Sequence, residues 1–250
     1  MSTYTDEGIV LRRVDYGETD RILTVLTREH GKIGVIARGV RRSQSRLSAR
    51  TDLFARSRMQ LARGRGELDV LTQAEPVVAP PPAQDARRAA CAAVCAEVTD
   101  RVLESAHPDE EVFALVAGAL AACADPNRDP RAAVIWFARR LIDRLGYAPQ
   151  LSECAGCGQP LRETTAYFSA TAGGLLCQRC AASDPGAIEC PVRVIKVLRT
   201  AASGDAELWS RLRLDPATLA ALEAVVEHEL AFHLDRRVHS FAVLRAIERR

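Results

Sequence analysis

Several patterns that define common protein classes are absent from this sequence of 250 residues. No stretch reaches the roughly 18 consecutive apolar residues that a membrane-spanning helix needs, and the polar start from Met1 to Asp6 does not resemble a secretory signal. Gly31-Lys32 lacks the earlier glycine of a nucleotide-binding P-loop, and no GxSxG sequence is present. We therefore expect a cytoplasmic protein with no membrane partner, and we expect neither ATP hydrolysis nor serine catalysis.

Charge is distributed unevenly along the sequence. The whole chain carries a net charge of +2, but the segment from Arg28 to Arg65 holds eleven basic residues against two acidic ones. This segment therefore carries +9 and the remainder −7. Such a concentration of positive charge indicates a polyanionic partner. Phe54 is the only aromatic residue in the segment, so a nucleic acid would be held through its phosphates, with weak sequence dependence and strong salt dependence.

The first 80 residues have the pattern of a small β-barrel. Apolar runs rich in β-branched residues alternate with turn signals at Tyr16-Gly17, His30-Gly31 and 64–66. Five short strands in this length are typical of a closed barrel of the OB type. The predicted strands cover residues 9–14, 22–27, 33–37, 53–61 and 68–72.

The connection between the third and fourth predicted strands is rich in arginine. Residues 37–46 contain four arginines and no acidic residue, and the next strand continues the charge. In OB-type barrels, such loops and the adjoining strands form a groove that follows a nucleic-acid backbone, and arginine pairs well with phosphate. The alternative is a solvated loop that binds nothing. We predict DNA binding by Arg38, Arg41, Arg42, Arg46, Arg50, Arg56 and Arg58.

The rest of the sequence is mostly helical in pattern. The run from Pro76 to Pro82 contains four prolines and predicts a stiff linker. Asp129-Pro130 and Asp215-Pro216 are typical helix starts, with aspartate as the N-cap and proline in the first turn. We expect an α+β protein with an OB-fold domain at 1–79 and a helical bundle at 80–148 and 186–250, interrupted by a four-cysteine module at 149–185.

Four cysteines form the clearest chemical motif. Cys154 and Cys157 make one CxxC pair, Cys177 and Cys180 make another, and nineteen residues separate the pairs. This spacing is typical of a zinc ribbon, in which four thiolates hold one structural ion with no open position for a substrate. Two disulfides or free thiols are the alternative. The remaining cysteines are expected to be small buried residues, namely Cys91, Cys95, Cys123 and Cys190.

Several segments taken together resemble the bacterial recombination and repair protein RecO. The resemblance covers the barrel motifs in order, the proline-rich stretch, the alanine-rich helices and the four-cysteine module. The barrel motifs are GIVL (8–11), GETDRI (17–22), TREHGK (27–32), RGVRRS (38–43) and LTQAE (71–75). Each motif is weak alone, and their combination is specific.

The resemblance implies a non-enzymatic, nucleoid-associated mediator. It would bind single- and double-stranded DNA, anneal complementary strands and help place RecA on DNA coated by single-stranded DNA-binding protein. RecR is the implied partner and RecF a further candidate. In this family the coat protein's acidic, apolar-ended tail docks on the helical domain. For that role we nominate Trp136, Arg139, Arg140 and Arg144, with the alternative that Trp136 belongs to the core.

Two other classes of protein compete with this interpretation. A zinc-ribbon transcriptional regulator would share the metal and the basic charge, but the sequence offers no clear recognition helix. A metal-assisted nuclease or deaminase would need an open metal site or clustered carboxylates, and the His-x-Glu and Pro-Cys-x-x-Cys signature of the deaminases is missing. We therefore expect no catalytic residues.

Overall fold

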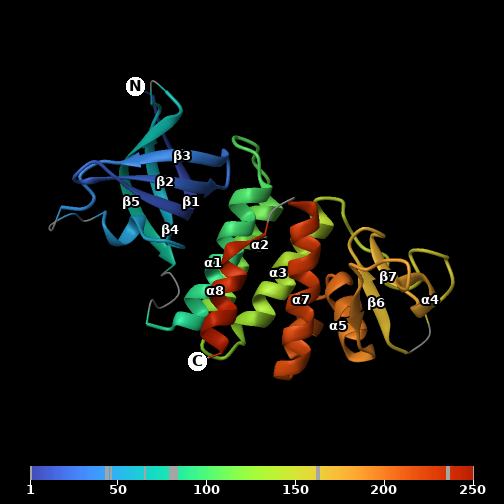
Figure 1. The fold of residues 1–250 in the computed structure, drawn as a ribbon. Coiled ribbons are helices and arrows are strands. Elements are labelled where there is room, and N and C mark those ends of the chain that lie inside the picture. Colours follow the sequence, from blue (N-terminus) through green and yellow to red (C-terminus); the bar gives the residue numbers. More distant parts are fainter. Residues whose placement is uncertain are drawn as a thin grey trace. The chain divides into compact units, whose positions relative to one another are not determined.

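The computed structural model describes residues 2–42, 45, 47–64, 66–78, 84–161, 164–234 and 237–249. A barrel comes first along the chain, followed by helices and a small module that carries the four cysteines (Figure 1). The chain divides into two units, Met1–Pro130 with Ala242–Arg250, and Arg131–Phe241. In the described part of the chain, no helix combines the length and apolar character that a membrane crossing requires.

Five strands form the barrel. They are β1 (Thr3–Tyr16), β2 (Asp20–Thr27), β3 (Gly31–Ala37), β4 (Arg56–Ala62) and β5 (Leu68–Val78), and they close in the order β1-β2-β3-β5-β4. All neighbouring strands are antiparallel except β3 and β5, which are parallel. This arrangement is that of an OB fold, so the predicted barrel is confirmed.

Side chains along the strands alternate between the inside and the outside of the barrel, and the inward-facing ones form its core. On β4, Met59 and Leu61 are fully buried while Arg58 is exposed, so one face of the strand lies in the core and the other faces solvent. The β1 register shifts between Val10 and Arg12. An extra residue of this kind bends a strand, and β1 indeed pairs with β2 along one stretch and with β4 along another.

One expectation about the prolines is wrong. Pro76 lies inside β5, opposite Ser57 of β4, and does not begin the linker. Proline is tolerated there because β5 pairs with β3 only from Leu68 to Val70, so the later part of β5 has a single partner strand within the described residues. The other prolines of the predicted linker fall in residues 79–83, outside the described residues.

Helices α1 (Ala86–Val102) and α2 (Glu110–Ala124) belong to the same unit as the barrel, as does α8 (His239–Glu248) from Ala242 onward. Asp85 and Asp109 cap α1 and α2 by accepting hydrogen bonds from backbone N–H groups. Arg87 of α1 joins α8 through a 2.5 Å ion pair between its Nε and Oε1 of Glu248.

The barrel packs directly on these helices. Asp100 of α1 pairs with Nε of Arg12 at 3.2 Å and with Nζ of Lys32 at 3.3 Å. Phe113 of α2 is fully buried, and the guanidinium groups of Arg28 and Arg56 lie over its ring. The predicted boundary near residue 79 thus falls between the end of β5 and the start of α1, but it does not divide the two units.

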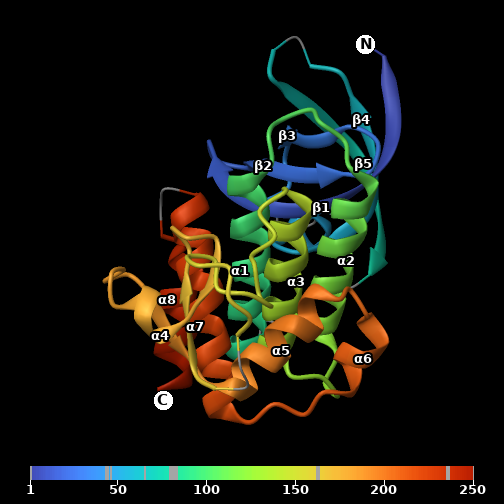
Figure 2. The same ribbon diagram turned by 90° about the vertical axis from the view of Figure 1, so that its right-hand side faces the viewer.

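The second unit contains α3 (Pro130–Arg144) from Arg131 onward, α5 (Val192–Ala202), α6 (Ala206–Arg211) and α7 (Pro216–His233). Figure 2 shows α5 and α6 following each other along the chain. The predicted Asp-Pro start of α7 is confirmed, because Asp215 caps it by accepting a hydrogen bond from the backbone N–H of Thr218.

Two buried ion pairs join α3 to α7. Arg131 forms two hydrogen bonds to Glu223, of 2.6 and 2.7 Å. Two turns further along α3, Arg139 pairs with Glu229. Because both residue numbers increase together from one pair to the next, the two helices run in the same direction at this contact.

Between α3 and α5 lies the cysteine-bearing module. It contains β6 (Ala166–Ser169), β7 (Gly174–Leu176), a short helix α4 (Gln178–Ala181) and β8 (Ile188–Cys190), with β6 in the middle of the sheet. Cys190 of β8, like the predicted cysteines of α1 and α2, is fully buried. The prediction of four small buried cysteines is therefore confirmed.

Candidate metal centre and nucleic-acid interface

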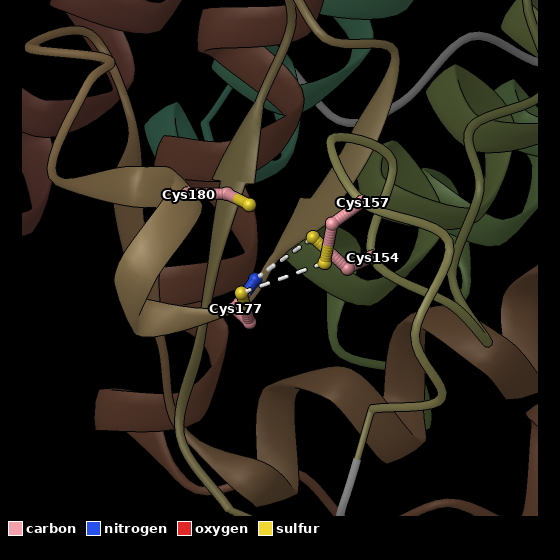
Figure 3. A group of neighbouring side chains, drawn as sticks. All are labelled: Cys154, Cys157, Cys177 and Cys180. Carbon is pink, nitrogen blue, oxygen red and sulfur yellow. Dashed lines mark hydrogen bonds between the residues drawn. The ribbon is translucent and has the colours of Figure 1, made fainter.

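Two tight turns bring the four predicted cysteines together (Figure 3). Cys154 and Cys157 lie on the first turn, which closes with a 2.8 Å hydrogen bond from the Gly158 N–H to the Cys154 carbonyl. Cys177 follows β7 and is the N-cap of α4, which carries Cys180. The sulfur atoms of all four lie within 4.8 Å of one another.

The absence of a side chain at Gly156 helps the two turns approach. A Cβ atom at Gly156 would lie 3.2 Å from both Cβ and Sγ of Cys180, closer than most Cβ contacts in proteins. The backbone N–H of Cys177 also donates a 3.3 Å hydrogen bond to Sγ of Cys154, which links the second turn to the first.

The donor set fits a soft divalent ion. Four sulfur ligands at about 2.3 Å from a tetrahedral ion lie about 3.8 Å apart, and the sulfur atoms of Cys157 and Cys177 are 4.0 Å apart. Cys154 is buried and the other three cysteines are half-buried. The residues can thus hold a metal ion in a closed site.

The pKa values of the thiols also favour the binding of a cation. Burial alone would raise the pKa of Cys154, but hydrogen bonds from the backbone N–H groups of Cys177, Cys157 and Gly156 lower it to about 6. In contrast, the other three thiols raise the pKa of Cys180 to about 12. Four adjacent thiolates repel one another, and a bound divalent cation removes this repulsion.

The predicted DNA-binding arginines lie mainly on the loop between β3 and β4 (residues 38–55), here called the β3–β4 loop. Arg38 and Arg42 are exposed, and Arg50 is half-buried on a single 3-10 turn, η1 (Ala49–Thr51). None of these three has a salt-bridge partner among the described residues. Arg46 lies outside the described residues.

Asp20 fixes the start of the β3–β4 loop. Its Oδ1 accepts a 2.8 Å hydrogen bond from the backbone N–H of Gly39. This hydrogen bond is the main reason that the pKa of Asp20 is held below its usual value, and the charges of Arg38 and Arg42 add to the effect. The two arginines therefore emerge from a loop whose first turn is anchored.

The other predicted arginines have acidic neighbours. Arg41 pairs with Asp15, and Arg56 pairs with Glu7 as well as lying over Phe113. Arg58 is exposed but stands opposite Glu7 and Glu75 in the strand register. Within the part of the chain that the structure describes, Arg38, Arg42 and Arg50 have no salt bridge, whereas the other predicted arginines lie beside carboxylates.

The sequence reasoning missed basic residues before residue 28. Arg12 and Arg13 follow the bulge in β1, and Arg21 lies on β2. Their charges are diluted by aspartates and glutamates nearby in the sequence, so a charge count along the chain does not reveal them. The pairing of β1 with β2 would have shown that Arg21 lies opposite Asp15.

The residues nominated for partner docking separate into surface and interior positions. The side chain of Arg139 is 1% exposed and pairs with Glu229 and Asp143, so it is not available to a partner. Trp136 is half-buried, with its ring centroid 5.4 Å from that of Trp209 and with Arg140 above it at 5.9 Å. Arg144 is exposed at the end of α3.

The fold and the site define a class of protein: an OB barrel joined to helices, with a four-cysteine module that can hold a metal ion. Two family models match this chain. The model described as "Recombination protein O N terminal" matches residues 1–79, and the model described as "Recombination protein O C terminal" matches residues 83–241. The chain belongs to the RecO family, and so to the proteins of DNA repair and recombination.

Curated relatives agree with the family models. The DNA repair protein RecO of Roseiflexus sp. (strain RS-1) is 38% identical over 245 residues, covering 96% of this chain and 84% of that protein. The protein of the same name from Bifidobacterium adolescentis is 34% identical, covering 98% of this chain and 100% of its own length. That of Nocardioides sp. is 35% identical, covering 96% and 98%.

Proposed function

We propose that this protein binds single- and double-stranded DNA through the barrel, anneals complementary strands without nucleotide hydrolysis, and assists RecA loading together with RecR. The observation that carries the proposal is the exposed Arg38 and Arg42 on the anchored β3–β4 loop, within a segment of charge +9. Two DNA strands repel each other through their phosphates, and a basic surface lowers that repulsion and concentrates the strands.

An annealing assay with complementary oligonucleotides and no ATP tests this proposal. We expect the double variant Arg38→Ala/Arg42→Ala to anneal several-fold more slowly than the wild-type protein. A matched control, Arg128→Ala/Arg193→Ala, removes the same charge at exposed positions outside the barrel and should leave the rate unchanged. Equal rates for all three proteins would remove the loop from the mechanism. Site-specific duplex binding without annealing would support the transcriptional regulator instead.

We also propose that the acidic, apolar-ended tail of single-stranded DNA-binding protein docks on α3. Trp136 offers an apolar ring and Arg140 and Arg144 offer charge on one side of the helix. Binding of a labelled tail peptide should weaken in Trp136→Ala and in Arg140→Ala. It should not change in Arg193→Ala, which lies in the same unit and is more exposed. The proposed role in DNA repair also includes RecF as a further partner and an association of the protein with the nucleoid.

For the cysteine site we propose one structural zinc ion. The four thiolates offer a closed, all-sulfur environment, which is typical of zinc sites that stabilise a small module and do not carry out catalysis. The bound ion would neutralise the thiolates and join the two turns.

A further inference from the structure

Two aspartates connect three arginines on the barrel. Asp52 accepts hydrogen bonds from Arg13 of β1 and, at 3.2 Å, from Nη1 of Arg21 of β2. Asp15 accepts a 3.1 Å hydrogen bond from Nε of Arg21 and lies 3.3 Å from Nε of Arg41. These five residues are called the arginine–aspartate network below.

The network joins segments that are distant in sequence. Asp15 and Arg21 face each other across the β1–β2 pair, and Asp52 lies in the β3–β4 loop shortly before β4. Arg41 is held in the same loop by a 2.9 Å hydrogen bond from its backbone N–H to the Thr19 carbonyl. The three guanidinium groups are therefore fixed relative to the barrel by contacts from both strands and the loop.

Stability does not account for the network. The Asp15 and Asp52 side chains are 54% and 45% exposed, more than those of Arg21 at 14% and Arg13 at 36%. Ion pairs with this exposure contribute little to stability, because solvent screens them. Placing two carboxylates beside the most basic segment also lowers its attraction for a polyanion. A benefit that compensates for this loss is the ordering of long arginine side chains before a ligand arrives.

Each arginine keeps donors for a further ligand. A guanidinium carries five N–H donors in a plane. Among the described residues, Arg21 and Arg41 use Nε and Nη1, which leaves Nη2 of both without a hydrogen bond. Phosphate oxygens are good acceptors for such groups.

We propose that Arg13, Arg21 and Arg41 form a phosphate-binding array for a nucleic-acid backbone, with Asp15 and Asp52 as positioning residues that hold it. The inference rests on the proposed function, because it assumes that the barrel binds DNA. It adds Arg13 and Arg21, which lie outside the basic segment 28–65, and it gives two acidic residues a positive role in binding an anion.

This role can be separated from a simple charge effect because the two make opposite predictions. Replacing either aspartate with asparagine removes one negative charge and so raises the net charge by one. If only net charge matters, Asp15→Asn and Asp52→Asn bind DNA more tightly. If the aspartates position the arginines, both variants bind more weakly in spite of the added charge. Glu18→Gln is the matched control, since Glu18 is exposed in the β1–β2 turn and has no salt bridge among the described residues.

The experiment is fluorescence anisotropy of the full chain with a labelled single-stranded oligonucleotide at several salt concentrations. We expect Asp15→Asn and Asp52→Asn to bind about three- to tenfold more weakly, as for one or two side chains that must be ordered on binding, and Glu18→Gln to bind equally or more tightly. Tighter binding by all three variants overturns the positioning role. If the wild-type chain does not bind the oligonucleotide at all, the proposed function fails together with this inference.

Two further variants keep the test valid if an asparagine variant unfolds. Asp52→Glu retains the charge and should restore most of the affinity. Arg21→Lys keeps the net charge but loses the planar donor group, so it should weaken binding at unchanged thermal stability. Wild-type affinity in Arg21→Lys excludes Arg21 from the array.

Discussion

Arginine side chains have three kinds of surroundings in this chain, and their sequence positions do not distinguish them. Arg42 is exposed with no salt bridge among the described residues, Arg21 is held by two aspartates, and Arg139 is buried between Glu229 and Asp143. Arg139 stands next to Arg140 in the sequence, and two adjacent charged residues suggest a surface. The interior position of Arg139 becomes clear only from the fold, because Glu229 of α7 lies beside it.

Removing Arg139 should destabilise the second unit in a pH-dependent way. Burial raises the pKa of Glu229, and the charge of Arg139 opposes this effect. In Arg139→Met the carboxylate loses its partner, so we expect a loss of about 3–5 kcal/mol in the free energy of unfolding at neutral pH. Urea denaturation with CD detection measures it.

The sign of the pH effect follows from proton linkage. Without Arg139 the folded state retains a proton on Glu229 that the unfolded state releases above its ordinary pKa of 4.5. The stability of the variant therefore rises as pH falls from 7 toward 5, and its deficit shrinks. The double variant Arg139→Met/Glu229→Gln should recover part of the stability and show a flatter pH dependence. A deficit that is the same at pH 5 and pH 7 would contradict this account.

Gly31 and Gly17 provide a matched pair of glycine positions. Both have positive φ, +69° and +56°. A Cβ atom at Gly31 would lie 2.5 Å from the backbone of His107, whereas one at Gly17 would meet nothing within 4 Å. We expect Gly17→Ala to cost about 1–2 kcal/mol from backbone strain alone and Gly31→Ala to cost more. Chemical denaturation of both variants checks the order; equal costs would mean that the barrel shifts freely at this contact.

At the scale of secondary-structure elements, the sequence predicted the strands and helices whose side-chain pattern has a clear period or a clear end. The alternation in β4 and the Asp-Pro start of α7 both correspond to observed structure. The short helix α6 and the strands of the cysteine module were not predicted, because three to six residues do not establish a period. The four cysteines that could hold a metal ion were predicted from spacing alone, and the structure brings them together.

The cysteine module depends on a few short elements, so its metal should be needed for its fold. We expect the wild-type protein to contain about one zinc ion per chain. Cys177→Ser should contain none and should lose protection of the module in hydrogen exchange. Cys190→Ser is the control, since Cys190 lies in the same module but outside the cluster, and it should keep its zinc. Stoichiometric zinc in Cys177→Ser would show that the four-thiolate description is wrong.

At the scale of the whole molecule, charge separation is the dominant property. A segment of +9 coexists with a remainder of −7, and part of the acidic charge lies next to the barrel at Asp100 and Glu110. These two carboxylates offset the charge of the arginines that they contact. The positive potential of the barrel is therefore strongest away from Asp100 and Glu110. The sequence revealed the separation, but only the fold shows which arginines are engaged by carboxylates.

The salt dependence of DNA binding should report the number of phosphate contacts. If Arg38, Arg42 and Arg50 and the three arginines of the arginine–aspartate network each contact one phosphate of a single strand, the slope of log K against log salt is about −4. Arg42→Ala should make that slope shallower by about 0.7, while Arg128→Ala should not change it. Binding titrations between low and moderate salt give these slopes, and a flat plot would rule out a phosphate-based interaction.

The division into units has a consequence for how the chain is made. The unit that begins with the barrel also includes Ala242–Arg250, which follow the whole of the second unit in sequence. During synthesis, Arg87 emerges from the ribosome more than 150 residues before Glu248, its partner in α8. The barrel and the first two helices must therefore wait for the second unit to be translated before their own unit is complete.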